Sequence, residues 1–339
     1  MPEFISLRTA EFVTPQHPDK ICDFIADTLL DSYLLGDPNS RVAVEVMGGH
    51  GFITLNGEVT STAKVNAEKI VAQIVGPDFK VLSNIAKQSP EIAPGVDAGG
   101  AGDQGIMVGY ACAETESLMP LEYELARGLC QKIYEVYPFD GKVQVTLDGL
   151  GAREQVKCVV ASFQNTKSSE LEKLVREFLP GAKQYLINPA GDWNQGGFDA
   201  DSGLSGRKLV VDNYGPQVPL GGGSFSGKDY TKVDRSGAYM ARKVAVDLLQ
   251  ITSRAVKSAS SGRATVNEVT VKLAYAIGVA HPVMATAYFN GTSIDITDRY
   301  DFTPAGIRSA LALDKVKYSD TCTWGHFGRG FAWDEPFAE

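Results

Sequence analysis

The chain lacks an excess of positive charge, paired cysteine motifs and long apolar runs. Its 339 residues carry 32 Lys and Arg against 41 Asp and Glu, so the net charge of −9 argues against a general nucleic-acid or anionic-membrane surface. Five scattered cysteines form no C-x-x-C pair, which predicts reduced thiols and a cytoplasmic location. No uninterrupted apolar run approaches the ~20 residues of a membrane helix, and the start "MPEFISLRTAEF" has no apolar signal-peptide core. We therefore expect neither nucleic acid nor membrane as a partner.

What the chain does have is the composition of a globular protein, with 44% hydrophobic and 22% charged residues. Apolar residues at helical spacing predict helices over 17–37, 64–76, 121–137, 168–179 and 233–251. Alternating patterns predict strand pairs over 41–61, 142–163 and 268–291, and a loop over 89–111. Helices cluster with hairpins rather than alternating singly with strands, so the pattern favours an α+β fold over a doubly wound parallel sheet. We expect three units, 1–92, 93–196 and 197–339, interleaved in space.

The stretch "LGGGSFSGKDYTKVDRS", residues 220–236, nearly matches a P-loop. However, Asp229 replaces the hydroxyl residue of that motif, and "VPLGGG" is a poor strand. The segment still offers two cations, Lys228 and Lys232, and a carboxylate in the first turn of a helix, Asp234. It therefore suits a polyphosphate held by other chemistry, with a P-loop kinase as the competing hypothesis.

A second candidate anion site is "HPDK", where His17, Asp19 and Lys20 stand at a helix start. Free backbone N–H groups and the helix dipole favour anions there, although a capping histidine followed by a first-turn acid is an ordinary alternative. Asp19 and Asp234, from distant segments, would together suit a Mg²⁺-polyphosphate.

Three further stretches carry little information alone. "GGAGDQG" (99–105) is typical of a flexible loop, "FDGK" (139–142) of a turn, and "SGLSGRK" (202–208) of a loop ending in surface cations. Each also carries a charged residue beside glycines, where a backbone can approach a ligand closely.

Taken together, the ordered set "HPDK", "GAGDQG", "SGRK", "GGGSFSGKD.TKVDRS", "YAIGVA" and "GHFGR" resembles the S-adenosylmethionine synthetases (methionine adenosyltransferases). The resemblance runs from about residue 8 to residue 334. It implies the fold of that family, three similar α/β units about a pseudo-threefold axis. It also implies a mobile gate loop at the start of the central unit.

The resemblance implies the synthesis of S-adenosylmethionine from ATP and L-methionine. The methionine sulfur attacks the ribose 5′ carbon and expels triphosphate, which is then hydrolysed to pyrophosphate and phosphate. Thioether sulfur is already nucleophilic, so alignment and neutralisation of the growing charge carry the catalysis. The implied cofactors are Mg²⁺, two per site, and K⁺. The implied partner is a second copy, in a homodimer with shared active sites that can pair into a tetramer.

The resemblance also implies roles for individual residues. Those implied for catalysis are His17, Asp103, Lys142, Arg207, Lys228 and Lys232. Those implied for ATP binding are His17, Asp140, Lys142, Asp192, Trp193, Asp201, Arg207, Lys208, Ser224 and Lys228. The methionine contacts are Glu58, Gln88, Asp201 and Lys232, and the metal ligands are Asp19 and Asp234 for Mg²⁺ and Glu45 for K⁺.

The sequence departs from the family pattern at three places. Asp192 and Trp193 replace an Arg-Phe pair, Leu220 replaces a histidine, and the gate loop "APGVDAG" is short. Because a carboxylate would repel triphosphate, we predict that Asp192 faces the nucleoside edge while Trp193 stacks on adenine. The competing hypothesis is a degenerate homologue that binds nucleotide without turnover or serves as a partner subunit.

Overall fold

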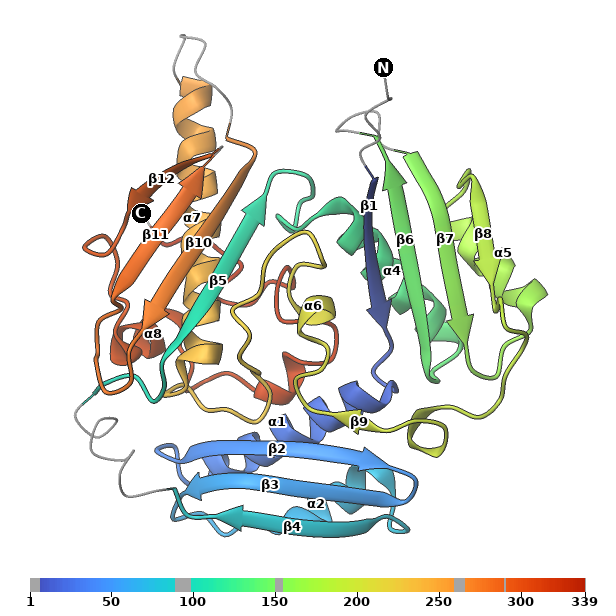
Figure 1. The fold of residues 1–339 in the computed structure, drawn as a ribbon, viewed down its shortest axis with the longest axis horizontal. Helices are drawn as coiled ribbons and strands as arrows, with labels where there is room; N and C mark the ends of the chain where they lie inside the picture. The colour runs from blue at the N-terminus through green and yellow to red at the C-terminus, as the bar shows by residue number, and fades with distance from the viewer. Residues whose placement is uncertain (1–6, 89–98, 150–154, 259–265, 290, 339) are drawn as a thin grey trace.

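The protein, described here as a computed structural model, is built from three four-stranded sheets arranged around a common centre (Figure 1). The structure describes residues 7–88, 99–149, 155–258, 266–289 and 291–338. In Figure 1 the sheets lie in front and the long helices lie behind them. One face of each sheet is therefore covered by helices, and the other, which we call the open face, is not.

The N-terminal sheet has the strand order β4-β3-β2-β9. Its strands are β2 (Arg41–Gly49), β3 (Phe52–Thr60), β4 (Lys80–Ala86) and β9 (Gly203–Leu204). The helices α1 (Pro18–Gly36) and α2 (Ala67–Val75) cover it. Every second residue of β2 from Val42 to Gly48 is buried, which is the alternation of a sheet with one covered face.

The central sheet has the order β1-β6-β7-β8, from β1 (Leu7–Val13), β6 (Gly141–Asp148), β7 (Gln155–Phe163) and β8 (Gln184–Ile187). The helices α4 (Leu121–Val136) and α5 (Ser168–Phe178) pack on it. The C-terminal sheet has the order β12-β11-β10-β5, from β5 (Gly105–Cys112), β10 (Glu268–Tyr275), β11 (Met284–Phe289) and β12 (Thr292–Asp295). The helix α7 (Val233–Ser258) lies along its back, with α8 (Pro304–Leu311) beside α7 (Figure 1).

Each sheet borrows one strand from another unit, in a cycle. The N-terminal β1 pairs with β6 of the central sheet, and β5 pairs with β10 of the C-terminal sheet. The later strand β9 returns to pair with β2 of the N-terminal sheet. The three segments predicted as units therefore interleave, while the boundaries at 92 and 196 stay predictions.

The predicted helices and hairpins are present, with ends shifted by at most three residues except in α7, which continues beyond the predicted end at 251 to Ser258. One prediction is wrong in part: the sequence pattern indicates a loop over 89–111, but residues 105–112 form β5. The part of the gate loop at 93–98 lies outside the described residues. The sequence patterns do not predict several further elements, namely β1, β4, β8, β9, β12, α6 (Leu209–Asp212), α8, and the short 3-10 turns η2 (Gly197–Asp199) and η3 (Tyr318–Asp320).

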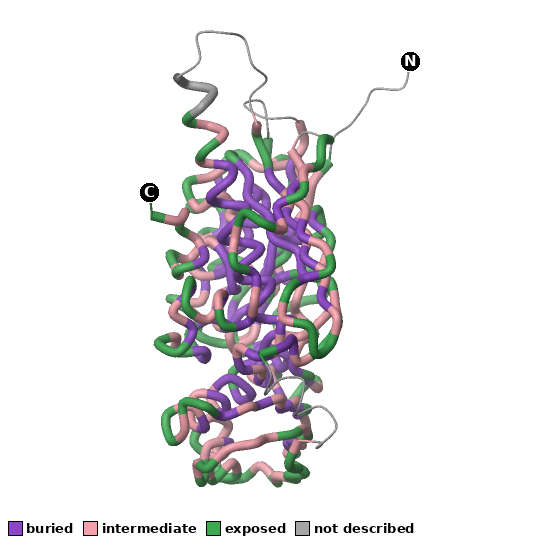
Figure 2. Tube along the Cα trace, turned by 90° about the vertical axis from the view of Figure 1, so that its left-hand side faces the viewer, coloured by how far each residue is buried: buried purple, intermediate pink, exposed green. Residues whose placement is uncertain are grey.

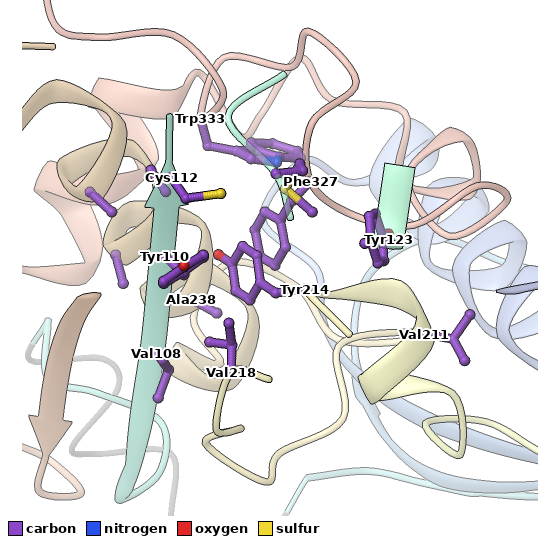
Figure 3. Close-up of a cluster of buried hydrophobic side chains, with 14 of the residues drawn as sticks. Val108, Tyr110, Cys112, Tyr123, Val211, Tyr214, Val218, Ala238, Phe327 and Trp333 are labelled. Atoms are coloured by element: carbon purple, nitrogen blue, oxygen red, sulfur yellow. The ribbon is translucent and has the colours of Figure 1, made fainter. Parts of the chain in front are cut away.

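The core lies between the sheets and their helices, as the buried residues in the turned view of Figure 2 show. At the centre of the molecule, Tyr214 stacks on Phe327 with ring centroids 4.7 Å apart and an interplanar angle of 3°. Tyr110 of β5 meets the edge of Tyr214 at 5.8 Å (Figure 3). This aromatic cluster joins β5 to the segment after α6 and to the C-terminal segment. No helix in the described ranges is both long enough and apolar enough to traverse a bilayer.

His326 is buried in this core, and its Nδ1 lies 2.8 Å from the hydroxyl of Tyr239. Burial, reinforced by the positive charge of Arg235, holds the pKa of His326 well below its ordinary 6.5. At about pH 6 the imidazole of His326 therefore binds a proton in the unfolded chain but not in the folded chain. This contribution to stability is complete above pH 6.5 and is lost as the pH falls below it.

We expect the unfolding free energy of the wild-type protein to fall more steeply below pH 6.5 than that of His326→Gln, by up to about 1.4 kcal/mol per pH unit. Denaturant titrations at several pH values above and below 6.5 measure how steeply the unfolding free energy of each protein depends on pH. The same titrations on His281→Gln, a change at an exposed histidine, serve as the matched control. Parallel slopes for wild type and His326→Gln would contradict the assignment.

Candidate active site

The first group of predicted residues, the His17 cluster, gathers at the start of α1. We define it as His17, Asp19, Lys142, Arg207 and Lys208. His17 caps α1, because the backbone N–H of Asp19 donates to its Nδ1 at 3.2 Å. The interpretation of "HPDK" as a helix cap is therefore confirmed, while the anion site with Asp19 as a metal ligand stays a prediction. Since Nδ1 accepts a hydrogen bond, the proton of the neutral ring lies on Nε2.

The carboxylate of Asp19 is buried and holds three donors. Its Oδ1 accepts from the backbone N–H of Leu204 at 2.9 Å and forms an ion pair with Nε of Arg207 at 3.0 Å. Its Oδ2 accepts from Nζ of Lys208. Burial alone would raise the pKa of Asp19, but the hydrogen bonds from Lys208 and Leu204 outweigh it, so the pKa is lowered and the group is an anion.

Burial, followed by the positive charge of Lys208, lowers the pKa of His17 to about 3, so the ring is neutral. The positive charge of Lys142 also lowers the pKa of His17, while the negative charge of Asp201 raises it. Lys142 is exposed on β6, opposite Ser162 of β7. The indole Nε1 of Trp193 donates to the Ser162 hydroxyl at 3.0 Å. Trp193 is thereby held beside the Lys142–Ser162 rung, where an adenine ring can stack on it.

Asp140 and Asp192 have internal partners. Oδ2 of Asp140 accepts from the backbone N–H of Gly197 at 2.9 Å. Oδ1 of Asp192 accepts from the backbone N–H and hydroxyl of Ser168 and from the side-chain amide of Asn188. Asp192 thus anchors the start of α5. Its predicted contact with the nucleoside stays a prediction.

The second group, the Lys228 cluster, lies between the N-terminal and C-terminal sheets. We define it as Glu45, Lys228, Asp229, Lys232 and Asp234. Lys228 Nζ lies 2.8 Å from Oδ2 of Asp234, and Lys232 Nζ lies 2.7 Å from Oδ1 of Asp229. Burial raises the pKa of Glu45, whose Oε2 accepts from Ser205 at 2.5 Å, and Lys228 and Asp234 also act on its charge.

The structure rules out a P-loop over residues 220–236. The described chain has no strand leading into these glycines, and α7 begins only at Val233. Asp229, in the place of the P-loop hydroxyl, is fully buried and accepts from the backbone N–H of Val42 at 2.7 Å. Asp229 therefore fastens the segment to β2, while Lys228 and Asp234 remain partly exposed.

Glu58 joins the Lys228 cluster through the sheet. Ala43 of β2 pairs with Glu58 of β3 on one side and forms an isolated bridge with Lys228 on the other. Asp103 is exposed just before β5, in a segment whose Gly102 donates to the carbonyl of Thr231. Within the described residues, two predicted contacts have a buried polar atom without a hydrogen-bond partner, Oε1 of Gln88 and Oγ of Ser224.

These groups suit a Mg²⁺ ion that takes most of its ligands from water and phosphate oxygens and few from the protein. Among the described residues, no three His, Cys, Asp or Glu side chains converge as a protein-made metal cage. Each cluster instead offers one predicted carboxylate, Asp19 or Asp234, next to cations. Mg²⁺ commonly binds one or two carboxylates and completes its shell with water and phosphate oxygens, so the donor set suits it.

A large cavity lies elsewhere in the molecule. It measures about 640 Å³ and opens beside α1, against apolar side chains such as Phe24, Phe79 and Phe198. Of the predicted site residues, only Asp140 lines it. We therefore place the candidate site at the two clusters and not in this cavity.

The sequence patterns do not single out Asp23 and give Lys20 no role. Oδ1 of Asp23 accepts from the backbone N–H of Gly206 at 2.9 Å, and Lys20 Nζ donates to Asp212 at 2.5 Å. Lys20 stands inside the "HPDK" motif, so the motif itself is the available signal. Its partner lies 192 positions away and cannot be inferred from spacing.

Comparison with known proteins yields the same family in all three parts of the chain. The models of the N-terminal, central and C-terminal domains of S-adenosylmethionine synthetase match residues 6–90, 98–193 and 195–335. The chain belongs to the S-adenosylmethionine synthetase family. Members of this family are methionine adenosyltransferases, so the resemblance noted in the sequence is confirmed, as is the three-unit α+β fold.

The relatives match over nearly their whole length. The S-adenosylmethionine synthase of a Nitratiruptor species is 40% identical, over 97% of this chain and 95% of its own. That of a Sulfurovum species is 39% identical, over 96% and 95%. The structure of an unusual S-adenosylmethionine synthetase from Campylobacter jejuni superposes with a TM-score of 0.83 at 33% identity, covering 97% of this chain and 96% of the other.

Asp192 can be tested with two substitutions. Asp192→Ala removes the acceptor for Ser168 and Asn188, so we expect a lower melting temperature. Asp192→Asn keeps an acceptor oxygen and should keep most of the stability. If Asp192 also contacts the nucleoside, the Asn variant weakens ATP binding while its affinity for free triphosphate stays unchanged. A tenfold gain in triphosphate affinity would instead mean that the carboxylate faces the phosphates.

Proposed function

We propose that this protein joins ATP and L-methionine into S-adenosylmethionine and then hydrolyses the released triphosphate to pyrophosphate and phosphate. A bond forms between the methionine sulfur and the ribose 5′ carbon, and the bond from that carbon to the triphosphate oxygen breaks. Its electron pair leaves with the triphosphate. The observation that carries the proposal is a neutral, capped His17 next to Asp19, which holds the cations Arg207 and Lys208, in a chain of this family.

The His17 cluster is suited to the leaving group. Nδ1 of His17 is occupied by the Asp19 N–H, so Nε2 carries the proton and donates to the departing oxygen. Arg207 and Lys208 supply cations for the triphosphate, and Lys142 reaches the same region from β6. Trp193 stacks on adenine, with Asp140 and Asp201 beside the nucleoside.

The Lys228 cluster is suited to the rest of the substrates. Lys228 and Ser224 face phosphate, while Lys232, Glu58 and Gln88 bind methionine, and Asp103 holds the nucleoside. When bound through Asp19 and Asp234, Mg²⁺ would neutralise charge on the triphosphate oxygens. Glu45 would hold K⁺. The chain's own residues then align the sulfur with the 5′ carbon and keep the leaving oxygen hydrogen-bonded.

We further propose that the active enzyme is a homodimer, joined through the open faces of the three sheets. The strands of these sheets carry exposed apolar side chains: Leu7, Met47, Phe52, Leu82, Ile106, Leu186 and Leu204. Exposed apolar patches of this kind mark interaction sites. A two-fold arrangement lets the His17 cluster of one chain meet the Lys228 cluster of the other, so that each site is shared. Two such dimers can pair into a tetramer.

The reaction is tested by incubating the protein with ATP, methionine, Mg²⁺ and K⁺ and separating the products. We expect S-adenosylmethionine with equal amounts of pyrophosphate and phosphate, and no product after removal of divalent metal with EDTA. A kinase would give ADP. A degenerate homologue would bind ATP without turnover, and either result would overturn the proposal.

The shared site is tested by mixing two variants, Lys142→Ala from one cluster and Lys228→Ala from the other. Each alone should be nearly inactive. After subunit exchange at equal amounts, we expect about one quarter of the wild-type activity, because half of the dimers are mixed and each holds one intact site of two. Mixing Lys142→Ala with Arg207→Ala, both in the His17 cluster, is the matched control and should restore nothing. A fully active monomer in sedimentation would rule the shared site out.

A further inference from the structure

The side chain of Lys20 is buried at the base of the His17 cluster and has no role in the proposed chemistry. Only 2% of Lys20 is exposed. Its Nζ donates to Oδ2 of Asp212 at 2.5 Å and lies 3.4 Å from Oδ2 of Asp23. Asp212, at the end of α6, is itself 3% exposed. Net stability alone does not account for such a buried charged pair, because an apolar pair of similar volume is often as stable.

Lys20 and its neighbour Asp19 both connect α1 to α6, with the positions of the positive and negative charge reversed between the two ion pairs. Asp19 on α1 holds Lys208, and Lys20 on α1 holds Asp212. Lys208 and Asp212 are one helical turn apart, since the backbone N–H of Asp212 donates to the carbonyl of Lys208 at 2.7 Å. Two ion pairs of reversed polarity therefore fix both the distance and the register between α1 and α6. A shifted register would place like charges together.

The ion pairs of Asp19 and the Lys20–Asp212 pair differ in whether a bound polyphosphate can replace one of the partners. Lys208 is partly exposed and Arg207 is half exposed, so both can turn from Asp19 toward a polyphosphate. Both side chains of the Lys20–Asp212 pair are buried, so a polyphosphate in solvent does not reach them and the ion pair stays intact. It is therefore the connection that persists when the Asp19 pairs are exchanged for contacts with phosphate. The backbone N–H of Gly206, held by Asp23 at 2.9 Å, supports the same segment from its other end.

We propose that Lys20 is a positioning residue, which holds Arg207 and Lys208 in place beside α1 while these cations bind the triphosphate part of the substrate. The proposal rests on the proposed function of the His17 cluster. It assigns Lys20 no contact with substrate. Its effect reaches the reaction only through Arg207 and Lys208, and a displacement of about 1 Å in such groups can cost on the order of a hundredfold in rate.

The test compares wild type with Lys20→Met, which removes the charge and keeps the length of the side chain. Inorganic triphosphate with Mg²⁺ is titrated by calorimetry, and kcat and both KM values are measured. We expect triphosphate affinity and kcat to fall at least tenfold, while KM for methionine stays within twofold, because its predicted contacts belong to the Lys228 cluster. Triphosphate affinity and kcat both within twofold of wild type would overturn the proposal.

A matched control separates positioning from general loss of stability. Lys243 of α7 is also buried, and its Nζ donates to the backbone carbonyls of Ala332 and Glu335, in the C-terminal segment. Lys243→Met should lower the melting temperature without changing triphosphate affinity. If it weakens triphosphate binding as much as Lys20→Met does, the effect of Lys20 is merely structural and the proposal fails.

A second variant covers the case in which Lys20→Met does not fold, since Asp212 is then buried without its cation. Lys20→Met with Asp212→Leu replaces both charges by apolar groups. We expect a folded protein with triphosphate affinity still reduced at least tenfold, because an apolar contact does not fix register. Wild-type affinity in this variant would overturn the proposal. The binding measurement does not need turnover, so an inactive wild type would count against the proposed function alone.

Discussion

A buried ion pair between α1 and α7 holds the centre of the molecule together. Asp27 and Arg235 are almost fully buried and meet in a two-point contact, with Nη1 to Oδ1 at 2.6 Å and Nη2 to Oδ2 at 2.8 Å. The same groups bind the loop between them: Gly227 donates to Asp27, and Arg235 donates to the carbonyls of Phe225 and Lys228. Because removing one partner would leave an unpaired buried charge, the position of Lys228 depends on both.

The two clusters follow one electrostatic rule. Every cation assigned to phosphate, apart from Lys142, rests against a carboxylate of its own chain: Arg207 and Lys208 against Asp19, and Lys228 against Asp234. Such pairing holds long, flexible side chains near one geometry and so reduces the reorganisation needed when an anion arrives. A chain with a net negative charge can thus still offer cations to phosphate, because the cations assigned to phosphate lie together in the His17 and Lys228 clusters.

Much of the fold can be predicted from the sequence because it depends on local patterns, whereas the predicted site residues depend on the family resemblance of the ordered motifs. The periodicity of 17–37 and 121–137 marks two helices, and the glycine-rich motifs mark the segments near substrate. β5 escapes prediction because its glycines suggest a loop. The structure explains Gly109 there: a Cβ atom would lie 2.0 Å from the backbone of Ala241, so the strand needs glycine to approach α7.

The partners of the site residues cannot be predicted, since they come from packing between distant segments. The sequence pattern marks Asp19 as a metal ligand, yet its contacts with Arg207 and Lys208 arise only when α1 meets a segment nearly two hundred positions later. The interpretation of Asp192 rests on charge alone, whereas its bond to Ser168 depends on where α5 begins. The sequence shows which residues carry charge, and the three-dimensional fold determines which of these charges form ion pairs.

The cyclic exchange of strands also constrains how the chain is made. During synthesis β1 emerges first, but its partner β6 appears only after residue 141, and β2 waits for β9 at 203 and 204. β5 waits for β10, which begins at 268. Until then each sheet has an unpaired edge, the arrangement that invites wrong pairing with another chain. A chain cut between units would leave each sheet without its borrowed strand, so the three units depend on one another for complete sheets.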